Sequence, residues 1–135
     1  MTIEYKISRP DKLIEVSAVG ETSEKEWMNL FLGIKNDPER VEGMDFLFDL
    51  RDHKTIVSNK YLWAVTQRMI PIITRKKHVK WAFVTLREAS REKIQKFSLY
   101  LIKSNNIEVN SFTELDMAVA WINKDKEERH KEDSA

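Results

Sequence analysis

Four polar residues, Asp49, Arg51, Asp52 and His53, lie in and just after the apolar segment DFLFDL. Carboxylates and an imidazole are common metal ligands and proton-transfer groups in proteins. Such a site needs further donors from elsewhere, and the two other histidines of the chain lie far away in sequence. The alternative is a loop in which Asp49 and Asp52 accept backbone amides and Arg51 pairs with one carboxylate. We favour this loop interpretation, with a regulatory role as the alternative, and predict no catalytic residue and no metal site.

Ser58 follows this cluster and precedes a segment whose apolar residues recur at helical spacing. A serine at a helix start accepts a hydrogen bond from a free amide of the first turn. Its hydroxyl could alternatively carry a phosphate, because negative charge is favourable at a helix N-terminus. We interpret Ser58 as a helix cap and keep the regulatory phosphate acceptor as the alternative.

The chain has the length of a single domain and almost no net charge. It has 135 residues, 41% hydrophobic and 33% charged, with a net charge of +1. This near-neutral balance gives no global attraction for nucleic acid. The apolar runs are too short for a transmembrane segment, and the N-terminus does not resemble a signal peptide, so we expect a cytoplasmic protein. The absence of cysteine excludes disulfides and thiolate chemistry.

The hydrophobic periodicity predicts alternating strands and helices around these polar residues. An opening hairpin is indicated by two β-rich runs separated by Arg9, Pro10 and Asp11. Ser23 and Glu26 have the spacing of a capping box, as do Thr113 and Asp116. We expect strands near residues 3–8, 12–19, 44–50, 79–85 and 107–112. We expect helices near residues 22–37, 58–73, 87–106 and 113–123.

This order, β-β-α-β-α-β-α-β-α, predicts an α/β domain over residues 1–123 with a mixed, mostly parallel sheet of five strands and four helices. The segment 44–50 is apolar almost throughout, which is typical of a central strand covered on both faces. Residues 124–135 contain no apolar residue before the final alanine. We therefore predict a charged, flexible tail.

The element order, the segment FLFDL and the C-terminal segment NSFTELDMAVAWI resemble the SpoIIAA-like proteins of the STAS superfamily, the sulfate-transporter and anti-sigma-factor-antagonist domains. In STAS antagonists, a strand that ends in Asp-Leu is followed by a loop and an Asp-Ser pair, whose serine is phosphorylated by a partner kinase. Asp49 and Leu50 match that strand end, and Ser58 matches the serine by spacing. Val57 stands where the family has aspartate, and NKYLW replaces the glycines that follow, so the resemblance does not carry the phosphorylation switch over intact.

Several large apolar residues lie off the main stripe of their predicted helices. They can be buried within the monomer, or form a homodimer patch or a groove for an apolar ligand. These interface or pocket candidates are Met28, Leu32, Trp63, Ile70, Met117 and Trp121.

The leading functional hypothesis is a non-catalytic STAS-like domain that acts through protein contacts, with a homodimer or another protein as partner and no cofactor. The alternative is a carrier or sensor of a small apolar molecule or lipid, since SpoIIAA-like sequences are often grouped with CRAL-TRIO-type lipid-binding domains. An enzyme is the third hypothesis, and it would need His53 near a second polar partner in a cleft.

Overall fold

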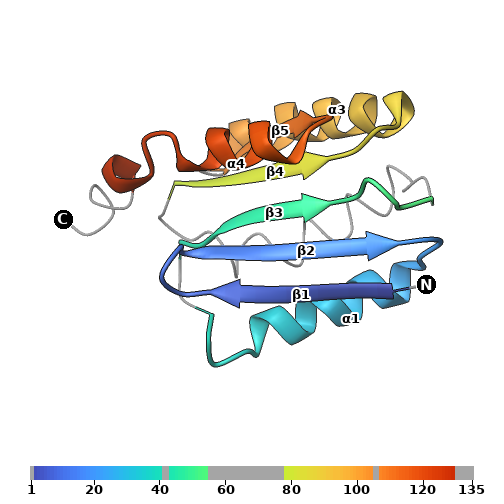
Figure 1. The fold of residues 1–135 in the computed structure, drawn as a ribbon, viewed down its shortest axis with the longest axis horizontal. Helices are drawn as coiled ribbons and strands as arrows, with labels where there is room; N and C mark the ends of the chain where they lie inside the picture. Colours follow the sequence, from blue (N-terminus) through green and yellow to red (C-terminus); the bar gives the residue numbers. More distant parts are fainter. Residues whose placement is uncertain (1, 41–42, 55–77, 105–106, 130–135) are drawn as a thin grey trace.

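The computed structural model of the chain describes residues 2–40, 43–54, 78–104 and 107–129. These residues form a five-stranded sheet in the order β1-β2-β3-β4-β5 (Figure 1). Strand β1 pairs with β2 antiparallel, and β2, β3, β4 and β5 pair in parallel. The strands are β1 (Thr2–Ser8), β2 (Leu13–Val19), β3 (Asp45–Asp49), β4 (Val79–Val84) and β5 (Ile107–Phe112). The predicted mixed, mostly parallel sheet is thus confirmed.

Strand β3, which lies in the segment 44–50 predicted as a central strand, and its neighbour β4 form the buried middle of the sheet. Every residue of β4 is buried, and in β3 only Asp49 is partly exposed. Phe48 of β3 stacks on Phe83 of β4, with ring centroids 4.4 Å apart and planes 5° from parallel. Side chains alternate between the two faces of a strand, so helices on both faces are needed to cover such runs.

In the described part of the chain, the helices that pack on the two faces of the sheet are α1 (Glu24–Lys35), α3 (Glu88–Ser104) and α4 (Leu115–Asn123). Helices α1 and α3 share one face and its large apolar cluster, whereas α4 covers the other face with a smaller one (Figure 1). The buried residues of α1 recur at helical spacing: Trp27, Leu30, Phe31 and Ile34. The predicted second helix, near residues 58–73, lies outside the described residues.

The two predicted capping boxes have different outcomes. At α1 the Ser23 hydroxyl accepts a hydrogen bond from the Glu26 amide, and the Glu26 carboxylate accepts one from the Ser23 amide. At α4 the prediction is wrong, because the N-cap is Glu114 and its side chain makes no cap hydrogen bond. The helix starts one residue later than a Thr113 cap requires, so its free amides are out of register with the Thr113 hydroxyl.

The predicted flexible tail is wrong for residues 124–129, which dock against the domain. Residues 126–129 are helical, and the side chain of Arg129 is only 5% exposed. Figure 1 shows this short segment at the edge of the sheet where the parallel strands begin. The segment docks because Arg129 forms an ion pair with the buried Asp45 carboxylate. A segment without apolar residues can therefore still be anchored. Residues 130–135 lie outside the described part of the chain.

In the described residues, no helix combines the length and the apolar character that crossing a membrane requires.

Candidate functional site

The loop after β3 lies at the edge where the parallel strands end, which is the usual ligand side of open α/β sheets. Backbone hydrogen bonds fix this loop to both neighbouring strands. The Leu50 amide donates to the Val84 carbonyl at 2.8 Å. On the other side, the Gly20 amide donates to the Asp52 carbonyl and the Lys54 amide to the Gly20 carbonyl, each at 2.9 Å. The backbone of the loop is therefore fixed on both sides, while the side chains of Arg51, Asp52 and Lys54 are exposed.

Asp49 and Arg51 form a bidentate ion pair, as the loop interpretation predicted. Arg51 Nε donates to Asp49 Oδ1 at 2.9 Å, and its terminal Nη2 donates to Oδ2 at 2.8 Å. The Arg51 amide also donates to Oδ1 at 3.3 Å. These contacts, the side-chain hydrogen bond first, lower the pKa of Asp49 below its ordinary value. The prediction that the Asp52 carboxylate accepts a backbone amide is wrong. The Asp52 side chain is exposed, and it is the Asp52 backbone carbonyl that accepts the Gly20 amide.

His53 is buried, with 6% of its surface exposed. Its Nε2 lies 2.7 Å from the Thr22 hydroxyl oxygen, which accepts a hydrogen bond from Trp27 Nε1 at 2.8 Å. Because the indole can only donate, the Thr22 hydroxyl proton is available for an unprotonated Nε2. Burial, followed by the charge of Arg87, lowers the pKa of His53, which favours this neutral imidazole. His53 thus ties the loop after β3 to the start of α1.

This arrangement is better suited to holding a loop than to chemistry. A general base must reach a substrate proton, whereas the described contact of His53 Nε2 points to Thr22 inside the protein. Among the residues that the structure describes, no three His, Asp or Glu side chains gather closely enough to hold a metal ion.

A mixed surface of Leu86, Arg87, Arg51, Asp52 and Lys54, hereafter the loop surface, occupies the same edge of the sheet. Leu86 follows β4 and is 61% exposed, the largest exposure among the large hydrophobic residues described. The Arg87 guanidinium donates to the Lys54 carbonyl at 2.9 Å and so joins the two segments. The other members are exposed charged side chains.

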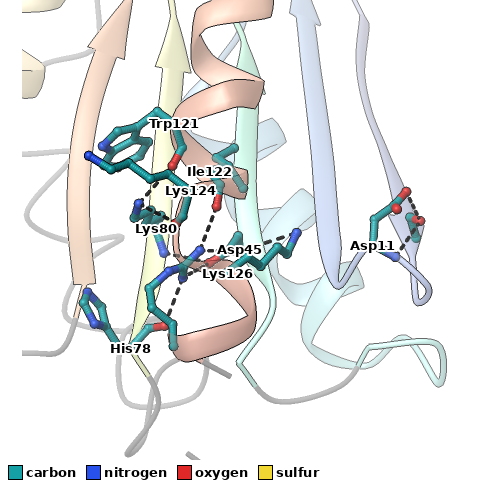
Figure 2. A network of polar contacts seen from close by, with 10 residues as sticks. Asp11, Asp45, His78, Lys80, Trp121, Ile122, Lys124 and Lys126 are labelled. Carbon is teal, nitrogen blue, oxygen red and sulfur yellow. Dashed lines mark hydrogen bonds and ion pairs between the residues drawn. The ribbon is translucent and has the colours of Figure 1, made fainter. Parts of the chain in front are cut away.

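At the opposite edge a buried polar network joins the start of β3 to the C-terminal segment (Figure 2). The Asp45 carboxylate, 0% exposed, receives two hydrogen bonds from the Arg129 guanidinium, at 2.8 and 3.1 Å, and one from the Lys80 amide at 2.8 Å. Arg129 also donates to the backbone carbonyls of His78 and Ile122. The sequence patterns did not predict this network, although an aspartate at the start of an otherwise apolar strand was a signal for it.

Lys80 completes the network from the next strand. Its ammonium donates to the carbonyls of Trp121 and Lys124, at 2.9 and 3.2 Å, and lies 4.8 Å from the centroid of the Trp121 ring (Figure 2). The last carbonyls of a helix lack partners within the helix, so a cation there stabilises its end. The polar groups of this network are therefore occupied in holding the C-terminal segment and the end of α4. The loop surface, whose charged side chains are exposed, is the candidate site.

The remaining predicted site residues divide into three groups. Met28 packs against the larger core cluster and Trp121 against Phe112, so for these two the structure favours packing within the monomer. Leu32 and Met117 are 47% and 56% exposed and stay interface candidates. Ser58, Trp63 and Ile70 lie outside the described residues, so the cap and interface predictions for them stay predictions.

Comparison with known proteins supports the fold alone. No protein-family model matches the chain, and no curated protein is similar to it. Among solved structures, it is similar to an uncharacterized protein of the DUF3478 family with a SpoIIAA-like fold from Shewanella loihica PV-4. The TM-score is 0.60 at 15% sequence identity, and the match covers 90% of this chain and 92% of that chain. The chain thus has the SpoIIAA-like α/β fold that its sequence motifs indicated.

Proposed function

We propose that this chain is a non-catalytic, STAS-like protein-interaction domain whose contact region is the loop surface. The observation that carries the proposal is an exposed charged loop whose backbone is fixed to both neighbouring strands. A partner that binds a fixed loop does not have to order it, and this lowers the entropic cost of association. The fold is similar to that of a SpoIIAA-like protein, and the proposed region follows Asp49 and Leu50, which resemble the strand end of STAS antagonists.

The composition of the loop surface supports a protein partner, which can be a second copy of the chain. Exposed leucine beside two arginines offers an apolar anchor together with planar hydrogen-bond donors, a combination suited to protein interfaces. The structural use of His53 supports a domain without catalysis, since its imidazole is buried against Thr22. The proposal includes a homodimer as the first partner to test.

The test compares two exposed leucines on different parts of the molecule. Leu86→Ser changes the loop surface, and Leu32→Ser changes α1, where Leu32 is the competing interface candidate. Sedimentation velocity over a wide concentration range measures self-association, and cross-linking in the native host captures other protein partners. We expect Leu86→Ser to weaken the association and Leu32→Ser to leave it unchanged, and the reverse result places the interface on α1 and contradicts the proposal. A wild-type chain that stays monomeric and captures no protein through the loop surface contradicts the proposal.

A carrier of a small apolar molecule or lipid is the second proposal, and it depends on the predicted positions of Trp63 and Ile70. Both residues lie outside the described part of the chain. Native mass spectrometry of the purified protein separates the two proposals, because it reports both the number of subunits and the mass of any small molecule retained. A bound apolar molecule in a monomer favours the carrier, and a ligand-free oligomer favours the interaction domain.

A further inference from the structure

Helix α4 leaves part of its own side of the sheet uncovered. It packs over β3, β4 and β5, while the same face of β1 and β2 carries the exposed residues Glu4, Lys6, Glu15 and Ser17. Between this open face and α4 lies a groove with a volume of about 250 Å³. Leu47 at its floor and Leu115 and Val119 on α4 give it an apolar side.

The strand register places the charged groups of the groove in two rows. In one row Glu4 of β1 pairs with Ser17 of β2, and Ser17 pairs with Asp49 of β3. In the next row Lys6 pairs with Glu15, and Glu15 with Leu47. These residues alternate with buried ones along the strands and therefore point to the same face. The groove thus has carboxylates on both sides of Ser17 and an apolar wall beside them.

The carboxylates differ in whether another group already neutralises them. Asp49 is held by Arg51 in a bidentate pair. Glu4 and Glu15 make no hydrogen bond or ion pair of 4 Å or less with any residue that the structure describes, although Lys6 lies across from Glu15. Among the lining side chains, the carboxylates of Glu4, Glu15 and Asp49 face one cation, Lys6. The groove therefore has an excess of negative charge next to an apolar surface.

The size and the lining of the groove fit one long cationic side chain. Pockets for drug-sized ligands hold roughly 300–1,000 Å³, so this groove is better matched to a single side chain than to a large cofactor. Arginine combines an apolar stem, which packs on aliphatic groups, with a planar guanidinium that binds carboxylates in a bidentate geometry. Both halves have a counterpart here, the stem at Leu115 and Val119 and the guanidinium at Glu4 and Glu15.

We propose that the groove between α4 and the open face of β1 and β2 receives an arginine side chain of a protein partner. This inference rests on the proposed function, because it names the partner's chemistry for an interaction domain. Asp49 lines the groove and also anchors Arg51 of the loop surface, so a single partner can contact both regions. The groove and the loop surface can nevertheless be tested separately, because Leu86→Ser changes only the loop surface and substitutions of Glu4, Glu15 and Ser17 change only the groove.

The direct test uses the full chain and two blocked peptides, acetyl-Ala-Arg-Ala-amide and its citrulline analogue, which has the same shape without the charge. Amide chemical shifts in ¹H–¹⁵N NMR spectra locate and quantify the binding. We expect saturable shifts at Ser17, Leu115 and Val119 with the arginine peptide, and binding at least about tenfold weaker with citrulline. Equal binding of the two peptides, or shifts spread over all acidic regions, overturns the proposal.

Two variants test the groove from opposite sides. Glu4→Gln combined with Glu15→Gln removes the charge and should weaken peptide binding by about tenfold, whereas Glu92→Gln, an exposed glutamate on α3, should not. Ser17→Phe fills the groove at an exposed strand position and should abolish binding while the circular dichroism stays native. Undiminished binding by either folded variant rejects the inference.

The inference and the proposed function fail separately. If Leu86→Ser disrupts the association with a protein partner but the folded groove variants keep it, the interaction domain stands and the arginine groove is rejected. If the arginine peptide binds in the groove but no protein partner is captured through the loop surface, the groove stands as a site for arginine and the proposed function fails.

Discussion

The buried carboxylate of Asp45 and the buried guanidinium of Arg129 form a bidentate ion pair between residues 84 positions apart in the chain. This contact holds the C-terminal segment against the start of β3. Lys126 adds a longer contact to the same carboxylate, at 3.7 Å.

Removing the arginine should therefore destabilise the whole domain. Arg129→Met leaves the Asp45 charge buried without its main partner, which typically costs about 3 kcal/mol of unfolding free energy. Urea denaturation measures this loss, and Glu127→Gln, an exposed change in the same segment, is the control. A change within about 0.5 kcal/mol, the usual range for surface substitutions, contradicts the docked segment.

The starts of α1 and α4 offer a test in which two hydroxyl residues should behave differently. Ser23→Ala removes the capping hydrogen bond to the Glu26 amide and should lower the unfolding free energy by about 1 kcal/mol. Thr113→Ala should have little effect, because Glu114 is the N-cap of α4. Thermal unfolding of both variants under identical conditions checks the difference, and equal losses count against the assigned caps.

His53 should make the stability of the domain depend on pH. Burial lowers its pKa in the folded protein below the ordinary value of 6.5, so the unfolded chain binds the proton more readily. The stabilising contribution is then complete above pH 6.5 and decreases as the pH falls through the folded pKa. Unfolding free energies measured from neutral to mildly acidic pH should fall less steeply for His53→Gln than for the wild type. Parallel curves contradict the assignment.

Thr22 should matter through its hydroxyl group. Thr22→Val keeps the shape but removes the hydrogen bonds with His53 and Trp27, which should cost about 2 kcal/mol because buried polar groups lose their partner. Amide hydrogen exchange at Gly20 and Lys54 should accelerate, since His53 no longer fixes the loop. Thr22→Ser keeps the hydroxyl and should restore slow exchange. Unchanged exchange in Thr22→Val shows that the loop is held by its backbone contacts alone.

Local patterns determined much of the fold, because they depend on neighbours in the sequence. The alternation around Arg9–Asp11 predicted the opening hairpin, the apolar run 44–50 predicted the central strand, and Ser23 with Glu26 predicted the start of α1. The Asp49–Arg51 pair was also predictable, since its members are two residues apart.

Only the tertiary structure decided which polar residues become buried and with whom. The sequence placed Arg129 in a solvated tail, and nothing near it indicates Asp45 as its partner. His53 is buried because Thr22 and Trp27 approach it from another part of the chain. Thr113 has the spacing of a capping residue, but α4 begins one residue later, with Glu114 as its N-cap. The physical reason is that hydrophobic periodicity records which face of an element is buried, whereas the pairing of charged and polar groups depends on where distant elements meet.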